Sequence, residues 1–393
     1  MRRDSNTKAI KTTIQPMIEI RTISSEKEIE QFIDFRTELY KDDPCAVPYL
    51  FMSEKNDLDK TKNLAFRFCQ AEYYMAYRDG KPVGRIAAII NHRANETWQK
   101  KNVRFGYFDF IDDLEVSKAL LEKVMDYGRK HGMTDIIGPM GFIDLDREGM
   151  LVEGFDVMAT MHANHNFPYY KDHMEALGFT KDNDWVQDLV TVPEKVPEKF
   201  EKIANMISKR YNLHARKMTK KEANRGKGKR LFEVLNKCYE GLYEFAELDD
   251  EQIDRLVKDY ISLADMNLIT LIVDGNKDDE IVGFGVTFSS FSKALRKTKN
   301  GKLFPFGWIH LLRTLLFHDT DTVDLLIIGV LPEYRGKGAN AILFNDLIRW
   351  YNKYHFKQAL TLAMMETNDG VLSAWQYLDA RTVKRLRSYR KSI

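Results

Sequence analysis

One stretch near the end of the chain constrains the fold more than any other. It covers residues 323–344 and has the sequence VDLLIIGVLPEYRGKGANAILF. Its first nine residues are apolar and rich in β-branched side chains, which is typical of a buried central strand. Pro332 ends that strand because proline has no amide hydrogen for the ladder. A basic glycine loop follows, and residues 339–350 have the apolar spacing of a helix.

The loop Arg335-Gly336-Lys337-Gly338 has the properties of an anion site. Backbone amides at the start of a helix can point at a phosphate, and the helix dipole favours the negative charge. Glycine allows close approach because it has no side chain. The spacing is neither that of a Walker loop nor that of the dinucleotide fingerprint.

These residues resemble motif A of the GNAT superfamily of acyl-CoA-dependent N-acyltransferases. That motif is [QR]xxGx[GA] after a strand that ends in V-x-P; Arg335 and Gly338 fill its slots, and Asn340 replaces the final Gly or Ala. The resemblance implies that acyl-CoA or acetyl-CoA is the co-substrate and that the loop binds its pyrophosphate. The cofactor-binding residues that it implies in this stretch are Ile328, Gly329, Val330, Arg335, Gly336, Lys337, Gly338, Ala339 and Asn340.

The tail after residue 366 resembles a later motif of the same family, in which an asparagine contacts the cofactor. Asn368 is the matching position. Many members carry a tyrosine further on, which protonates the leaving thiolate, but Trp375 occupies that slot here. An indole has no useful acidity, so the sequence assigns no general acid.

An amine that attacks a thioester must lose a proton, and a carboxylate near the expected thioester could accept it. Strand alternation puts Asp324 on the face of Leu326, Ile328 and Val330, and the histone-acetylating branch of the family has a glutamate base at the matching position. The alternative for Asp324 is a solvated carboxylate paired with a Lys or Arg. Glu366 is the second catalytic candidate, with a helix-entry carboxylate as its alternative.

The composition narrows the class of protein. The chain has 393 residues, of which 44% are hydrophobic, and this length predicts two domains. A net charge of +2 gives no reason to expect nucleic acid as a partner. Three cysteines without a framework indicate a reducing, cytoplasmic location. No apolar stretch is long enough for a transmembrane segment, and His162 and His165 lack a third ligand for a metal.

The order of elements in residues 1–192 is the GNAT order of strands and helices. After a linker at residues 193–197, residues 193–393 repeat it. We therefore predict an α/β protein with two tandem GNAT-like domains, each a mixed, mostly antiparallel sheet flanked by helices. Asp112 and Asp113 stand where the first half would need a phosphate loop, and two carboxylates repel a pyrophosphate. The first half is thus expected to act as a scaffold or lid.

An apolar segment, residues 303–317 with the sequence LFPFGWIHLLRTLLF, precedes the central strand. It is expected to be a helix packed between the two domains. The alternatives are a segment that lines a hydrophobic groove and one that makes peripheral contact with a membrane.

A narrower resemblance rests on EGFD, PYY, GF-K-D and PFGW, which occur in this order. The chain is similar in them to a group of long bacterial GNAT-like proteins, some of which are linked to N-acylation of sphingoid bases. This resemblance implies transfer of an acyl group from CoA to an amine, either a small molecule or a long-chain lipid. The alternative is a non-catalytic GNAT-like protein that binds CoA or regulates, which Trp375 and Asn340 favour.

Overall fold

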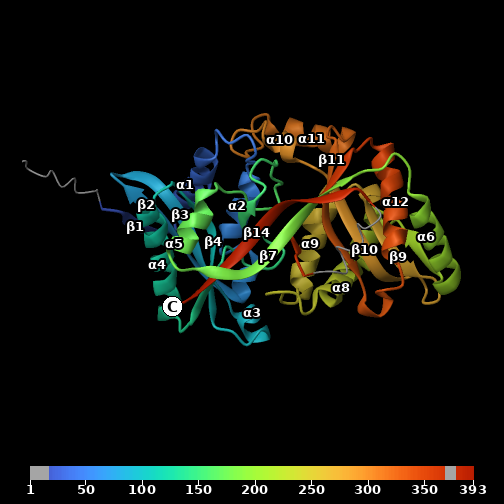
Figure 1. The fold of residues 1–393 in the computed structure, drawn as a ribbon, viewed down its shortest axis with the longest axis horizontal. Helices are drawn as coiled ribbons and strands as arrows, with labels where there is room; N and C mark the ends of the chain where they lie inside the picture. The colour runs from blue at the N-terminus through green and yellow to red at the C-terminus, as the bar shows by residue number, and fades with distance from the viewer. Residues whose placement is uncertain (1–16, 368–377) are drawn as a thin grey trace, which may run out of the picture.

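One sheet runs through the whole molecule. The computed structural model describes residues 17–367 and 378–393. Its strands follow the order β1-β2-β3-β4-β5-β14-β7-β12-β11-β10-β9-β8, with β13 paired to β7 and β6 paired to β14. Helices cover both faces of this sheet (Figure 1), so the predicted α/β class with mostly antiparallel strands is confirmed.

The first half follows the predicted order closely. Ser25 caps the first helix and forms a capping box with Glu28. The elements are β1 (Glu19–Ile23), α1 (Glu26–Leu39), α2 (Phe51–Leu58), η1 (Leu64–Arg67), β2 (Cys69–Arg78), β3 (Lys81–Asn91), α3 (His92–Thr97), β4 (Asn102–Phe110), α4 (Leu114–Lys130), β5 (Asp135–Gly138), β6 (Met150–Glu153), α5 (Tyr169–Ala176) and β7 (Thr180–Thr191).

In the second half, helix α8 ends at Tyr239, and the strand segment after α12 is broken into β12 and β13. The motif positions Asn368 and Trp375 lie outside the described residues. The elements are α6 (Glu198–Tyr211), β8 (Leu213–Arg216), α7 (Lys220–Glu222), η2 (Ala223–Lys227), α8 (Gly228–Tyr239), α9 (Asp250–Leu263), η3 (Met266–Leu268), β9 (Ile269–Asp274), β10 (Glu280–Ser289), α10 (Ser292–Leu295), α11 (Gly307–Phe317), β11 (Thr322–Val330), η4 (Pro332–Tyr334), α12 (Asn340–Lys353), β12 (Gln358–Thr361), β13 (Met364–Met365) and β14 (Ala380–Ser392).

The two halves repeat one supersecondary unit. Strand β3 pairs antiparallel with β4, helix α4 crosses over, and β5 pairs parallel with β4. Strands β10, β11 and β12 with helix α12 repeat this arrangement. The register also shifts within both pairs, between Arg85 and Ala87 and between Val286 and Thr287. A bulge in the same strand of each unit supports an internal repeat.

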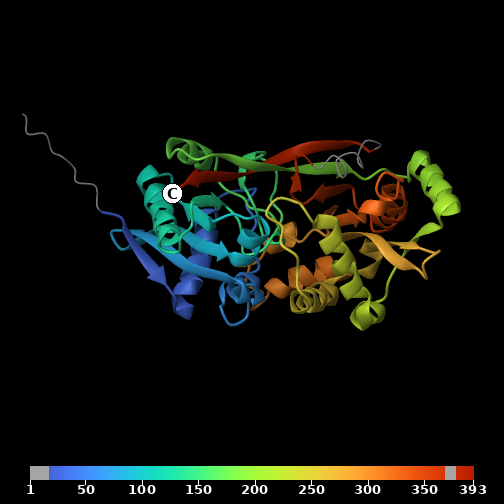
Figure 2. The same cartoon turned by 90° about the horizontal axis from the view of Figure 1, so that it is seen from below.

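The last strand of the chain joins the two halves. Strand β14 pairs with β5 and β6 of the first half and runs along β7, which itself pairs with β12 of the second half. Figure 2 shows β7 and β14 side by side along the length of the molecule. The division at residue 192 therefore marks the linker, whereas the final strand returns to the sheet of the first half.

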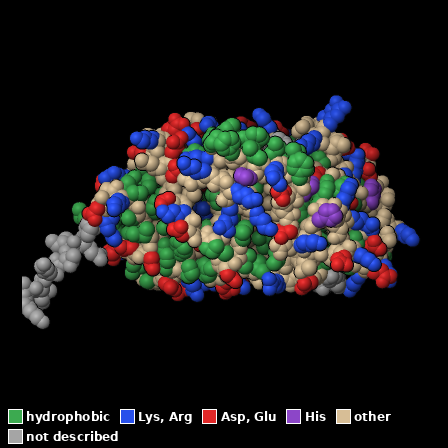
Figure 3. All heavy atoms as spheres, turned by 90° about the horizontal axis from the view of Figure 1, so that it is seen from above, with side chains coloured by type: hydrophobic (Ala, Val, Ile, Leu, Met, Phe, Trp, Pro, Cys, Tyr) green, Lys and Arg blue, Asp and Glu red, His purple; other side chains and the backbone are tan. Residues whose placement is uncertain are grey.

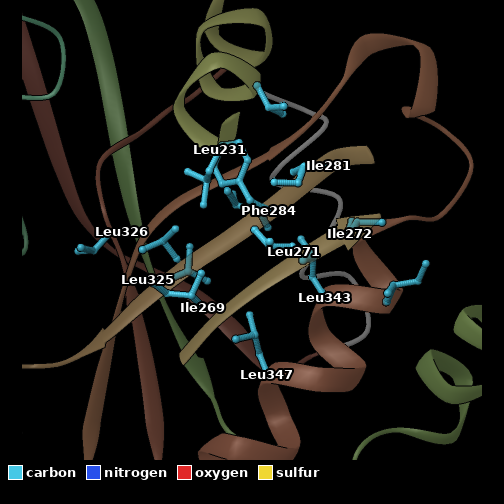
Figure 4. Packing of buried hydrophobic residues seen from close by; sticks show 14 of the residues in the cluster. Leu231, Ile269, Leu271, Ile272, Ile281, Phe284, Leu325, Leu326, Leu343 and Leu347 are labelled. Atoms are coloured by element: carbon cyan, nitrogen blue, oxygen red, sulfur yellow. The ribbon is translucent and has the colours of Figure 1, made fainter. Parts of the chain in front are cut away.

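The core of the second half forms on both faces of β9, β10 and β11. Leu231 of α8 packs on one face, and Leu343 and Leu347 of α12 cover the other (Figure 4). Helix α12 lies directly on the strand at Gly285, where a Cβ would be in van der Waals contact with Leu347 Cδ1 at 3.4 Å. The helix that follows the basic loop is thus fixed against the sheet.

Helix α11 does not have the predicted position. Only Gly307 and Thr314 of this helix are buried. Its large apolar side chains, together with those just before it, face outward; the exposed ones are Phe304, Phe306, Trp308, Ile309, Leu312, Leu316 and Phe317. The expectation of a helix packed between the domains was therefore wrong.

Candidate functional site

The loop between β11 and α12 has the geometry that an anion needs. The backbone amides of Lys337, Gly338, Ala339 and Asn340 have no hydrogen-bond acceptor within the described residues. Gly336 and Gly338 have φ angles of 73° and 82°. A Cβ at Gly338 would also lie 2.9 Å from Ile207 Cδ1 of helix α6. Glycine is required there by both backbone angle and space.

The two cations of the loop are partly engaged. The Arg335 guanidinium donates to the carbonyl oxygens of Val330 and Cys238 at 3.1 and 2.9 Å. It therefore ties the loop to the end of β11 and to α8. The Lys337 ammonium lies 4.7 Å from the ring centre of Tyr334 and has no ion-pair partner in the part of the chain described. Lys337 is the cation that remains available for a phosphate.

A bulge in β11 changes the predicted orientation of Asp324. Asp324 pairs with Phe288, whereas Ile327 pairs with Val286 and Ile328 with Gly285. Because Phe288 and Val286 share one face of β10, Asp324 shares a face with Ile327 and not with Ile328. The predicted alignment of Asp324 with Leu326, Ile328 and Val330 was wrong, since strand alternation was counted through the extra residue.

The carboxyl group of Asp324 is buried, with an exposed fraction of 2%. Its Oδ1 atom has no partner among the described residues, and no cation lies beside it. Burial raises its pKa to about 7, against a small opposing effect of a Ser290 hydrogen bond. The alternative of a solvated, ion-paired carboxylate is therefore excluded.

Glu366 has a different environment. Its carboxylate binds Lys181 Nζ at 2.5 Å and Arg385 Nη1 at 2.6 Å. The hydrogen bond from Lys181 is the largest cause that lowers its pKa. A carboxylate held by two cations is a weak proton acceptor. Asn368, the other candidate near this strand end, lies outside the described residues.

A cavity of about 1310 Å³ extends from the basic loop to the first half of the chain. All nine predicted cofactor residues of the strand and loop except Lys337 line it. On the opposite side, residues 139–150 of the loop after β5 form a continuous wall. Asp324 and Glu366 are not among the lining residues. The structure thus brings eight of these nine residues together along the cavity, whereas the two expected proton acceptors lie outside its wall.

Tyr239 connects the two sides of this cavity. Its hydroxyl is hydrogen-bonded by the backbone of Ile328. Burial raises the pKa of Tyr239, and the nearby Asp144 carboxylate raises this pKa further. Ile328 belongs to the strand of the second half, and Asp144 to the wall of the first half. The strand end and the acidic wall are therefore close neighbours.

The wall of the first half carries several titratable side chains. Burial raises the pKa of Asp144 and of Asp57 to about 7 each, and that of Glu148 well above its usual range. Burial and Arg147 lower the pKa of His162 to about 4, so its imidazole is neutral at pH 7. No group of three His, Cys, Asp or Glu side chains in residues 17–367 and 378–393 is arranged to hold a metal ion.

The matching strand end in the first half is filled by side chains. The Phe110 amide of β4 donates to the Tyr170 hydroxyl at 2.9 Å, and Tyr169 donates to the Phe110 carbonyl. Asp113 caps α4 and pairs with Arg78. These contacts occupy the positions that Ile328 to Asn340 leave open in the second half. The end of β4 is therefore occupied by the protein's own side chains.

Comparison with known proteins agrees with this arrangement. Residues 228–378 match the Acetyltransferase (GNAT) family. A tandem GNAT protein from the clavulanic acid biosynthesis pathway superposes with a TM-score of 0.55 at 12% identity, covering 96% of this chain and 98% of its own. The chain has the tandem GNAT fold. A GCN5-related N-acetyltransferase from Sphaerobacter thermophilus gives a TM-score of 0.52 at 12% identity, with 95% of each chain covered.

Two curated relatives match nearly the whole length of this chain. Protein YghO of Escherichia coli is 29% identical, with 95% of each chain covered. The bacterial ceramide synthase of Caulobacter vibrioides is 24% identical, with 94% of this chain and 96% of the relative covered.

Sequence reasoning missed the polar wall of the first half. Asp144, Glu148 and Tyr239 were not singled out. A signal was present in the run GFIDLDREGM, where four charged residues follow a short buried strand in an apolar context. The carboxyl end of a strand is a frequent location of functional side chains, so this run is a sequence signal for a functional site.

The glycine of the loop gives one test. We expect Gly338→Val to reduce CoA affinity at least about tenfold, because the side chain forces the amides out of line and strikes Ile207. Gly132→Ala is the matched control, since Gly132 has a φ of 74° and open space around it. Calorimetric titration with CoA measures both. Equal affinity of Gly338→Val and wild type would contradict the loop assignment.

The buried Asp324 gives a second test, of stability against pH. Its folded pKa of about 7 exceeds the ordinary value of 3.8, so the wild-type protein loses stability as pH rises between these values. Asp324→Asn removes this loss. We expect its melting temperature to exceed that of the wild type by on the order of 3 °C more at pH 8 than at pH 5. The same difference at both pH values, in thermal scans, would show that Asp324 titrates normally.

Proposed function

We propose that this tandem GNAT protein is an acyl-CoA-dependent N-acyltransferase that acylates a long-chain lipid amine. The observation that carries the proposal is the continuous cavity between the open loop amides and the acidic wall of the first half. CoA would bind at the loop, with its pyrophosphate on the amides of residues 337–340. Its thioester would lie along the end of β11.

The reaction would be direct attack of the amine on the thioester. The Ile328 amide, which now bonds the Tyr239 hydroxyl, would polarise the thioester carbonyl when the cofactor displaces that hydroxyl. Proximity of the two substrates in one cavity would supply a large part of the acceleration. Asp324, the base expected from the sequence, lies outside the cavity wall, so an amine in the cavity has no direct path to it.

The size and lining of the cavity support a long acyl chain or a lipid. A volume of about 1310 Å³ exceeds the usual range for small-molecule pockets. Its apolar part includes Phe200, Phe232, Phe288, Phe291 and Leu326. The curated relative named bacterial ceramide synthase is compatible with a sphingoid amine as the acceptor.

Release of CoA thiol in the presence of amines tests the function. Long-chain acyl-CoA with a long-chain amine should react faster than acetyl-CoA with a short polyamine. If acetyl transfer to the polyamine is faster, the lipid acceptor is wrong while the acyltransferase stands. Saturable CoA binding without thiol release over a broad amine panel would favour the non-catalytic alternative.

The exposed apolar surface around α11, formed by residues 304–317, supports contact with a lipid bilayer. Figure 3 shows hydrophobic side chains gathered on this side of the molecule, with Lys and Arg side chains beside them. Lys297 and Lys299 are exposed and have no ion pair within the described residues. Aromatic side chains next to free cations fit an anionic membrane surface. None of the helices in the described ranges has the length and apolarity needed to cross a bilayer.

The same surface connects to the cavity. Leu311 of α11 packs against a small buried cluster of Val47, Ala159 and Leu295. Met161 and Phe291 pack against the same cluster and also line the cavity. A lipid amine extracted at this surface would therefore have a short apolar route to the site. We propose that α11 is the entry side for a membrane-borne acceptor.

Vesicle binding tests this surface. Phe304 and Phe317 are 81% and 73% exposed, so replacing both by serine should leave the fold intact. We expect Phe304→Ser/Phe317→Ser to weaken binding to phosphatidylglycerol vesicles at least about tenfold. Met206→Ser, at another exposed apolar side chain, is the matched control. Unchanged vesicle sedimentation, or a dimer that the double variant dissociates, would overturn the membrane contact.

A further inference from the structure

The loop between β5 and β6 is held in a fixed shape. The Gly149 amide donates to the Pro139 carbonyl at 2.8 Å and closes the loop at its base. Asp146 Oδ2 accepts from the amides of Phe142 and Ile143 at 2.7 and 3.1 Å. Asp146 therefore has a structural task, which is to fold the loop that forms the wall of the cavity.

Two other carboxylates of this loop have no structural task. Asp144 lines the cavity and has neither a hydrogen bond nor an ion pair within residues 17–367 and 378–393. Glu148 also lines the cavity, is 9% exposed, and has one oxygen, Oε1, buried without a partner. A buried carboxylate oxygen without a partner, such as Glu148 Oε1, destabilises a folded protein. A cation bound between the two carboxylates would offset that cost.

The surrounding charges leave these two carboxylates available. Arg104 is the cation that acts on both, but it is already paired with Glu244 at 3.0 Å and hydrogen-bonded to the Gly141 carbonyl. Arg147 stacks on Tyr49 at 3.6 Å, and its field acts on Asp57 and His162. The carboxylates of Asp144 and Glu148 therefore remain without an ion-pair partner among the described residues.

The pair also lies near the expected thioester. Asp144 is close enough to Tyr239 to affect its titration, and the Tyr239 hydroxyl is hydrogen-bonded to the Ile328 backbone. Ile328 is the residue whose amide would polarise the acyl carbonyl. Asp144, Glu148, Tyr239 and Ile328 all line the same cavity, so an amine bound at the acidic wall would share that cavity with the thioester.

We propose that Asp144 and Glu148 form the acceptor subsite, binding the ammonium group of the amine and taking its first proton. This inference rests on the proposed acyl transfer. The neutral amine then forms the C–N bond, and the C–S bond breaks with its electron pair on the CoA sulfur. The second proton of the nitrogen goes to that sulfur, and the carboxylate pair returns its proton to water.

The electrostatics of the subsite agree with this role. Burial is the largest effect on both groups, and the Asp144 carboxylate also raises the pKa of Glu148. Asp146 and Glu244 act in the same direction, while Arg104 opposes them. With a pKa of about 7, Asp144 can accept a proton at neutral pH and release it again. An ordinary carboxylate would hold the ammonium but would rarely take its proton.

Binding of octylamine in the absence of acyl-CoA tests the subsite without any acyl transfer. We expect Asp144→Asn/Glu148→Gln to weaken octylammonium binding about thirtyfold or more at pH 8, because the buried charges that face the cation are lost. 1-Octanol, which has the same chain length and no charge, should bind both proteins equally. Asp57→Asn, a cavity carboxylate on the Arg147 side, should keep the wild-type affinity for octylammonium. Equal affinity of wild type and double variant, or loss in Asp57→Asn instead, would overturn the proposal.

Proton release gives a second readout that needs only the wild-type protein. Since the cation favours the ionised pair, octylammonium should displace about one proton at pH 6.5 and fewer at pH 8.5. Calorimetry in two buffers with different ionisation enthalpies counts these protons. Binding without proton release at pH 6.5 would contradict the subsite even if the variants failed to fold.

The outcomes separate this inference from the proposed function. Charge-dependent octylamine binding that requires Asp144 and Glu148, with no thiol release from any acyl-CoA, would keep the cation subsite and remove the acyltransferase. Thiol release that persists in the double variant with an unchanged KM for octylamine would keep the acyltransferase and remove the subsite.

Discussion

The pairing of β14 with β5 and β7 is the constraint on which the site depends. It makes one sheet of both halves and so fixes the wall of residues 139–150 against the end of β11. The buried ion pair between Arg104 and Glu244 adds a second connection at the same interface. Two domains joined only by the linker at residues 193–197 would hinge apart. The shared sheet gives a cavity whose two sides have a defined separation.

The two halves contribute different chemical groups to the cavity. The second half has open backbone amides, two left-handed glycines and a free lysine, which suit a pyrophosphate. The first half has filled its own corresponding strand end with Tyr169 and Tyr170. It contributes unpaired carboxylates instead, which suit an ammonium. In the proposed function, the second half binds the anionic co-substrate and the first half binds the cationic acceptor.

Much of the fold and of the anion loop could be predicted from the sequence because the signals are local. A β-branched run, a proline and two glycines determine β11 and its loop, and Ser25 with Glu28 determines the start of α1. The orientation of Asp324 could not be predicted, because one bulged residue in β11 reverses the alternation. The position of α11 was also predicted wrongly. An apolar sequence shows that a helix has a hydrophobic face, but it does not show whether another segment of the chain packs on that face. The role proposed for Asp144 and Glu148 could not be predicted, because it depends on the proximity of Asp144 to Tyr239, which is about ninety residues away in sequence.

The most direct measurement is a crystal structure with a bisubstrate compound in which a CH2–C(=O) group links the CoA sulfur to the nitrogen of octylamine. The account predicts the pyrophosphate on the amides of residues 337–340 and the amine nitrogen within hydrogen-bond distance of Asp144 and Glu148. A nitrogen next to Asp324, or a CoA moiety bound at the strand end of β4 in the first half, would contradict it.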